Sequence, residues 1–324
     1  MIVEVTDVRK DFVVWTKAGR LRRQRRVVPA VDGVNLRIEA GEMVGYLGPN
    51  GAGKSTTLKM LTGILRPTTG RVRVCGLEPV PQRLRLARRI GAVFGQRSQL
   101  WWDLPLGESF ALLRAVYRVP VEDHARRLAE CVDLLDLSPL LDVPVRQLSL
   151  GQRMRGELTA ALLHGPELLF LDEPTIGLDL VSKEAVRAFL AELNSRHGTT
   201  LVLTTHDLAD IERLCGRLVV VDHGQVVHDG TLAELHARYG SRRRLVVELD
   251  QPCARLAVAG ATTETVEADG RRQTLALDGD SSLPAVVAAV AAAAPLRDLK
   301  VLEPEIEEVI RRLYSDGDAS PQTR

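Results

Sequence analysis

The spacing of apolar residues divides the chain into short strand-like segments and longer helical ones. Ile2–Val8 alternates apolar and polar positions, which is the pattern of a half-buried strand. Further strands are predicted at Val34–Ile38, Glu42–Leu47, Arg71–Val74, Ile90–Phe94, Leu168–Leu171 and Thr200–Thr204, with a hairpin of Leu218–Val221 and Val226–Val227 across Asp222–Gln225. Helices are predicted at Lys54–Thr62, at Lys183–Ser195 and repeatedly between Gly107 and His164. Strands that alternate with helices indicate an α/β core.

The composition changes near residue 240, and the length of 324 residues favours two domains. Beyond that point, strands are predicted at Leu245–Leu249 and Thr274–Leu277, and helices at Ala285–Ala293 and Glu305–Leu313. We therefore expect a main domain over residues 1–240, with a helical subdomain at about 97–165. A small α+β accessory domain would cover 241–315, and 316–324 would form a disordered tail.

Charge and composition exclude several classes of protein. The 43 basic and 42 acidic residues give a net charge of +1, which argues against a surface built as a whole for nucleic acid. The longest uncharged apolar run, Ala285–Ala294, is shorter than the roughly 20 residues that cross a bilayer. The start of the chain lacks the pattern of a secretion signal. Four widely spaced cysteines indicate neither a zinc site nor a disulfide framework, so we expect a reducing, cytosolic setting.

One segment has the sequence of a phosphate-binding loop. Gly48-Pro49-Asn50-Gly51-Ala52-Gly53-Lys54-Ser55, followed by Thr56, fits the pattern G-x-x-x-x-G-K-[ST]. Glycines let several N–H groups converge on a phosphate, and the helix that follows points its positive end there. Lys54 would reach the β- and γ-phosphates, and the Ser55 hydroxyl would ligate Mg²⁺. A glycine-rich turn that merely ends in Lys-Ser is the alternative, which the flanking strand and helix disfavour.

A second segment places carboxylates at the end of a buried strand. Leu168–Leu171 is followed by Asp172 and Glu173, at the edge where parallel sheets bind ligands. Asp172 would lie beside Mg²⁺, and Glu173 would polarise the attacking water. A solvated acidic pair is the alternative. Together the two segments allow a kinase, a GTPase or a motor ATPase.

A third segment distinguishes these possibilities by its resemblance to a family. Leu148-Ser149-Leu150-Gly151-Gln152-Arg153 resembles the LSGGQ signature of ATP-binding cassette (ABC) ATPases. The resemblance implies that Ser149, Leu150, Gly151 and Gln152 begin a helix that faces the γ-phosphate bound by an opposite subunit. Leu150 stands where the family usually has glycine, and we expect hydrolysis to survive this departure. Taken alone, a serine that caps a helix explains the segment equally well.

Other positions follow the order of that family. Gln96 resembles the Q-loop glutamine, which implies contact with Mg²⁺ and the water. Asp179 resembles the D-loop aspartate, which implies a place at the dimer interface. His206 resembles the switch histidine, which implies contact with the γ-phosphate. Glu173, His206 and Gln96 would then be catalytic, and Ser55, Gln96 and Asp172 would hold the metal. Phe12 is the candidate for stacking on adenine, with Trp15 as the second choice and a core role for Phe12 as the alternative. The fold implied is a P-loop NTPase with a RecA-like α/β subdomain, an antiparallel β subdomain and a helical signature subdomain.

The stretch Phe94–Pro105, the insertion Thr16–Arg26 and the ending Glu303–Ile310 resemble ABC-2 type exporter ATPases of the drug-resistance and viologen-exporter kind. The resemblance implies an ATP hydrolase that uses ATP and Mg²⁺ and dimerises with a second copy or a paralogue. It would drive export through separate integral membrane permease subunits, from the cytoplasmic face of the plasma membrane, and no nucleic acid is expected. The alternatives are a soluble ABC ATPase that acts on ribosomes or DNA, and a nucleotide-gated regulator that senses a ligand through residues 241–313.

Two further features leave alternatives open. Thr16–Arg26 holds six basic residues in eleven and is expected to be an exposed hairpin tip or loop, either solvated or in contact with anionic lipid headgroups. The pair Trp101-Trp102 would either contact a permease or pack inside the helical subdomain.

Overall fold

The computed structural model describes residues 1–17, 23–95, 98–205, 207–239, 243–267, 269–278, 281–302, 309–310 and 313. The chain divides into two compact units, Met1–Leu232 and Ala233–Arg324. The division falls at the start of helix α8 (Leu232–Tyr239), so this helix groups with the second unit, whereas the sequence places the boundary just after it. The predicted helix at Glu305–Leu313 lies mostly outside the described residues.

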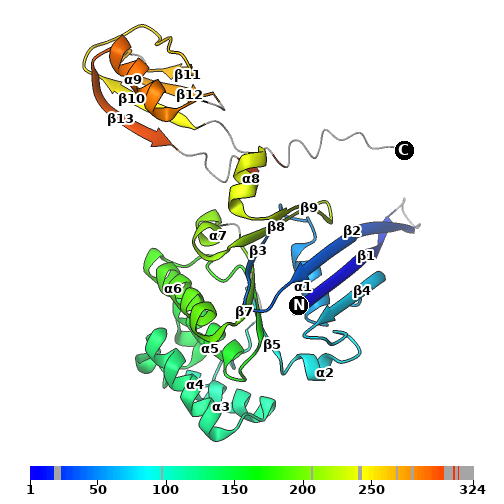
Figure 1. Ribbon diagram of the computed structural model, residues 1–324. Coiled ribbons are helices and arrows are strands. Elements are labelled where there is room, and N and C mark those ends of the chain that lie inside the picture. Colours follow the sequence, from blue (N-terminus) through cyan, green and yellow to red (C-terminus); the bar gives the residue numbers. More distant parts are fainter. Residues whose placement is uncertain are drawn as a thin grey trace. The chain divides into compact units, whose positions relative to one another are not determined.

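A three-stranded antiparallel sheet occupies one side of the first unit (Figure 1). Its order is β2 (Arg23–Ile38), β1 (Val3–Lys17) and β4 (Thr69–Val74). Thr16–Arg26 was expected to form an exposed hairpin tip or loop; residues 18–22 of it lie outside the described residues, while β1 continues to Lys17 and β2 begins at Arg23. Cross-strand pairing holds its described ends, Thr16–Lys17 and Arg23–Arg26, extended even though they lack an apolar alternation.

A six-stranded sheet forms the centre of the first unit and confirms the predicted α/β core. Its order is β5 (Ile90–Phe94), β6 (Leu168–Asp172), β7 (Thr200–Thr204), β3 (Met43–Leu47), β8 (Arg217–Asp222) and β9 (Gln225–Gly230). All neighbours are parallel except the β8–β9 hairpin. The parallel strands are covered on both faces, which explains their continuous apolar runs. Their carboxyl ends therefore meet along one edge.

Helices cover both faces of this sheet (Figure 1). Helix α1 (Lys54–Leu61) lies between the two sheets and contributes Leu58, Met60 and Leu61 to a core shared with both. Helices α5 (Leu150–Leu162) and α6 (Leu180–His197) lie on the other face, and the short α7 (Leu208–Leu214) follows β7. The predicted helical stretch resolves into α3 (Leu106–Tyr117), α4 (Val121–Leu134) and α5, while a short α2 (Arg83–Leu86) precedes β5.

The second unit holds a four-stranded antiparallel sheet with one helix against it. The order is β11 (Ala261–Val266), β12 (Arg272–Leu277), β10 (Arg244–Leu249) and β13 (Leu296–Leu302). Leu245, Val247 and Leu275 pack against Val286 and Val290 of α9 (Leu283–Ala293). Among the described residues, none of the helices combines the length and the apolar composition that crossing a lipid bilayer requires.

Close packing of α5 on the central sheet depends on Gly91 in β5. A Cβ atom at this position would collide with the backbone carbonyl of Ala161 in α5 and lie 2.7 Å from a methyl of Leu169. We expect Gly91→Ala to destabilise the protein by about 2 kcal/mol, because backbone atoms must move to make room. The measurement is the free energy of unfolding in urea. Gly216→Ala, where nothing lies within 4 Å of the added atom, serves as the control and should be near neutral; equal stability of the two variants would contradict the packing argument.

Candidate nucleotide site

The phosphate-binding loop connects β3 to α1 as predicted. Gly53 has φ +98°, and a Cβ there would collide with the carbonyl of Ala30, so only glycine fits at the start of α1. The Lys54 ammonium donates to the carbonyl oxygens of Gly48 at 2.6 Å and Pro49 at 3.1 Å. Lys54 is only 8% exposed, and burial lowers its pKa, while the nearby carboxylates of Glu173 and Asp172 oppose that shift. The loop therefore presents a nearly buried cation beside the first turn of a helix.

Asp172 lies where the ends of three elements meet. It ends β6, opposite Thr204 at the end of β7, and the Thr204 hydroxyl donates to its Oδ1 at 2.6 Å. The Ser55 hydroxyl in the first turn of α1 lies 3.4 Å from its Oδ2. A hydroxyl and a carboxylate are hard oxygen ligands of the kind that Mg²⁺ takes, so these residues fit a magnesium ion beside bound phosphates. Thr204 was not among the predicted site residues, although its position at the end of the neighbouring parallel strand could have indicated it.

Glu173, directly after Asp172, has a backbone conformation that residues other than glycine rarely adopt. Its φ is +57°, in the left-handed region, and its N–H donates to the carbonyl of Thr204 at 2.9 Å. Such a backbone persists where the surrounding structure holds it in place, and it is typical of functional sites. The other two predicted catalytic residues, Gln96 and His206, lie outside the described residues.

A buried polar network lies on both sides of position 206. The Asp210 carboxylate is fully buried and accepts hydrogen bonds from the Thr175 hydroxyl at 2.5 Å and from Arg187 of α6 at 2.5 Å. Asp207 forms an ion pair with Lys183 at 2.6 Å, and this hydrogen bond lowers the pKa of Asp207. The network thus ties the ends of β6 and β7 to α6. This network was not predicted from the sequence; a charged residue among the apolar positions of α7 was the available signal.

The signature segment begins α5 with a full capping box. The Ser149 hydroxyl accepts from the N–H of Gln152 at 3.2 Å, and the Gln152 side chain accepts from the N–H of Ser149 at 2.8 Å. A Cβ at Gly151 would lie 2.5 Å from the Ser182 hydroxyl of α6. The capping interpretation of Ser149 is therefore correct, and it is compatible with a second role because the first turn of a helix has further N–H groups without an intrahelical acceptor.

Asp179 caps α6 next to the signature segment. It accepts from the N–H of Ser182 at 2.9 Å and from its hydroxyl at 2.8 Å, and these hydrogen bonds lower the pKa of Asp179. Apolar side chains stand exposed around it, with Leu180 and Val181 at 72% and 79% exposure. We name Leu150, Ile176, Leu180 and Val181 the signature surface; all four are exposed.

A groove of about 440 Å³ lies beside the signature helix. Trp102, 52% exposed, lines it and lies 5.7 Å from the Arg153 guanidinium, so this ring is not packed inside the helical subdomain. Glu157 of α5 is buried in its wall, where it accepts hydrogen bonds from the Ser98 hydroxyl and from the N–H of Gln99 at 3.0 Å. Burial raises the pKa of Glu157. This carboxylate connects the signature helix to the segment that follows Gln96.

Phe12 is exposed rather than part of the core. It pairs with Val28 across the β1–β2 ladder, and Lys10 lies 5.3 Å from its ring centre. Ala30 lies two residues after Val28, and its backbone carbonyl is so close to Gly53 of the phosphate-binding loop that a Cβ atom there would collide with it. The ring thus lies on β1, beside the strand β2 that approaches the phosphate-binding loop.

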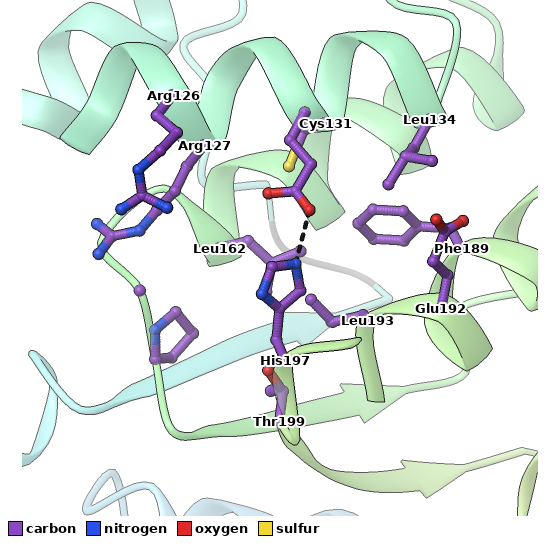
Figure 2. Close-up of a pocket in the computed structure, with 13 residues that line it drawn as sticks. Arg126, Arg127, Cys131, Leu134, Leu162, Phe189, Glu192, Leu193, His197 and Thr199 are labelled. Atoms are coloured by element: carbon purple, nitrogen blue, oxygen red, sulfur yellow. Dashed lines mark hydrogen bonds and ion pairs between the residues drawn. The ribbon is translucent and has the colours of Figure 1, made fainter. Parts of the chain in front are cut away.

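A separate cavity of about 230 Å³ lies between α4, α6 and the loop after α5 (Figure 2). Its apolar wall includes Leu134, Leu162 and Phe189, and a 2.6 Å hydrogen bond joins His197 of α6 to Glu130 of α4. Of the residues that line it, none is a predicted site residue. It is therefore distinct from the nucleotide site.

Comparisons with known proteins agree with this geometry. The family model described as ABC transporter matches residues 31–176. The chain is 36% identical to the daunorubicin resistance ATP-binding protein DrrA3 of Streptomyces coeruleorubidus over 291 residues, which cover 89% of the chain and 92% of the relative. It is 38% identical over 205 residues to the Nod factor export ATP-binding protein I of Cupriavidus metallidurans, covering 63% and 67%.

A solved structure shares the fold of the first unit. It is described as a dimeric structure of a post-hydrolysis state of the ATP-binding cassette MJ0796 bound to ADP and Pi. The TM-score is 0.61 at 30% identity, and the match covers 71% of this chain and 99% of that one. The similarity thus extends over a complete nucleotide-binding cassette.

The raised pKa of Glu157 predicts a pH dependence of stability. Below the ordinary carboxyl pKa of 4.5 both the folded and the unfolded chain are protonated at this residue. As pH rises above that value the unfolded chain ionises first, so the folded state loses stability until its own, higher pKa is passed. We expect Glu157→Gln to remove this slope in the free energy of unfolding, measured by urea titration at a series of pH values. The exposed Glu122→Gln should leave the slope unchanged, and parallel curves for all three proteins would contradict the assignment.

We expect the protein to lose much of its stability when the charge of Asp210 is removed. Asp210→Asn leaves the buried Arg187 guanidinium without its main counter-charge and should cost about 3 kcal/mol of unfolding free energy. Asp123→Asn, which removes an exposed ion pair with Arg126, should cost less than about 1 kcal/mol. Chemical denaturation measures both. A cost for Asp210→Asn no larger than that of the control would show that the network carries little stability.

Proposed function

The chain belongs to the ATP-binding proteins of ABC transporters and is an ATP hydrolase, and from this premise we propose that it drives an ABC-2 type membrane exporter. The relatives named for drug resistance and for Nod factor export support export as the direction. Integral membrane permease subunits would form the pathway, and the chain would lie against them on the cytoplasmic face of the plasma membrane. The observation that carries the proposal is the meeting of Lys54, Ser55, Asp172 and Glu173 at one sheet edge.

The residues of the site would divide the work of hydrolysis among them. The Lys54 ammonium, now held by two carbonyls of its own loop, would turn to the β- and γ-phosphates of ATP. Ser55 and Asp172 would hold Mg²⁺, which when bound neutralises phosphate charge. Glu173, fixed by its backbone next to Asp172, would orient and polarise the attacking water. Phe12 would stack on adenine, while Gln96 and His206 would complete the site.

The signature surface supports a head-to-tail dimer with a second copy or a paralogue. Ser149 and Gly151 begin a helix whose first N–H groups suit a phosphate, and Asp179 stands beside them. Exposed apolar side chains around these polar groups favour burial against a partner. Each ATP would then lie between the phosphate-binding loop of one chain and the signature segment of the other. Closure on ATP and release after hydrolysis would transmit force to the permease.

Glu173→Gln tests this proposal. The amide keeps the size of the side chain but cannot take up a proton from water, so ATP binding should persist while turnover falls by about a hundredfold or more. The variant should accumulate as a dimer with ATP and Mg²⁺, measured by light scattering after gel filtration. Turnover is measured by phosphate release.

Glu167→Gln is the matched control, because Glu167 stands just before β6, at its other end, in an exposed ion pair with Arg89. It should retain turnover. Wild-type turnover by Glu173→Gln would refute the role of Glu173, and the absence of a dimer would refute the closed-dimer arrangement.

A further inference from the structure

The outer half of the β1–β2 pair, residues 11–17 and 23–29, extends beyond the rest of its sheet (Figure 1). We name it the basic ribbon. Strand β4 pairs with β1 only as far as Arg9, so in the described part of the sheet the ribbon is two-stranded. A two-stranded ribbon is only marginally stable in water by itself, so its side chains gain from a further contact.

Apolar side chains stand exposed on both faces of the basic ribbon. Residues opposite one another across the ladder share a face. One face therefore carries the pairs Val13–Val27 and Trp15–Arg25, and the other carries Phe12–Val28 and Val14–Arg26. All eight side chains are exposed, and Trp15 is 61% exposed. Phe12, the candidate for stacking on adenine, lies nearest the nucleotide site, but the outer pairs Val14–Arg26 and Trp15–Arg25 still place an apolar side chain on each face. A groove in a partner protein would cover one such face, whereas an interfacial medium can cover both.

The charge of the chain is concentrated in this part of the sequence. Residues 12–31 contain six basic and no acidic residues, namely Lys17, Arg20, Arg22, Arg23, Arg25 and Arg26. The whole chain carries +1, so everything outside this stretch sums to −5. A negatively charged surface would attract the ribbon and repel the body, which orients the molecule with the ribbon toward that surface.

We propose that the basic ribbon inserts into the headgroup region of an anionic lipid bilayer. Arginines next to a bilayer are attracted by anionic headgroups, and tryptophan settles at the boundary between headgroups and acyl chains. Weak charge attraction and shallow apolar insertion together give stable binding where one alone would not. Nucleic acid shares the negative charge, but it would leave the valines of both faces in water. The inference goes beyond the proposed function, since it requires neither a permease nor ATP.

Flotation of the full chain with vesicles tests the charge requirement. We expect binding to phosphatidylcholine vesicles that contain phosphatidylglycerol and little binding to phosphatidylcholine alone. Arg25→Gln with Arg26→Gln should weaken the partition by about 25-fold, or about fivefold per arginine. Arg71→Gln with Arg73→Gln removes the same charge from exposed positions on β4 and should change it less than about twofold. Equal losses in the two double variants would overturn the assignment to the ribbon.

Fluorescence of Trp15 tests insertion. The chain has three tryptophans, so Trp101→Phe with Trp102→Phe leaves Trp15 as the reporter. Its emission should shift to the blue on anionic vesicles and be quenched by brominated acyl chains. An unshifted spectrum, or tighter binding to a DNA oligonucleotide than to vesicles of equal phosphate concentration, would overturn the lipid proposal. Thermal unfolding of every variant checks that the fold is intact.

Discussion

The buried ammonium of Lys54 is the constraint around which the site is organised. A cation this far from water needs compensation, and here two carbonyls of its own loop supply hydrogen bonds while Asp172 and Glu173 supply opposite charge. The carbonyls satisfy the group without neutralising it. An incoming polyphosphate therefore meets a charge already positioned and partly dehydrated, which strengthens the attraction relative to a solvated lysine.

The Lys54 ammonium can serve phosphate binding only if the carboxylates beside it keep their positions. The edge of the central sheet holds these carboxylates in place. Thr204 holds Asp172 from the neighbouring strand, and it also accepts the N–H of Glu173. One residue of β7 thus holds both Asp172, the last residue of β6, and Glu173, which follows it. The Asp210 network anchors the segment after β7 to α6 through a buried ion pair, and the unusual backbone of Glu173 is held by its hydrogen bond to the end of the same strand.

Local patterns predicted much of the fold. The bounds of β5 and β7 match their predicted spans because apolar runs with polar flanks mark buried parallel strands. The strands β11 and β13 were missed, since they lie at the edges of a small sheet where few side chains are buried. The phosphate loop was visible because its residues are contiguous. The bonds of Asp210 to Thr175 and Arg187 join positions 35 and 23 residues apart, which no local pattern encodes.

The signature surface and the basic ribbon both expose apolar side chains but differ in local charge, and this difference separates their partners. Asp179 lies beside the signature surface, and hydrogen bonds from Ser182 lower its pKa, so it stays ionised and an anionic bilayer would repel it. The basic ribbon has arginines on both faces instead. Without this difference in charge, the apolar side chains of the signature surface and of the basic ribbon would suit the same partner. Opposite local charge therefore directs one surface to a protein with paired polar groups and the other to anionic headgroups, so the same chain could bind a second copy and a membrane at once.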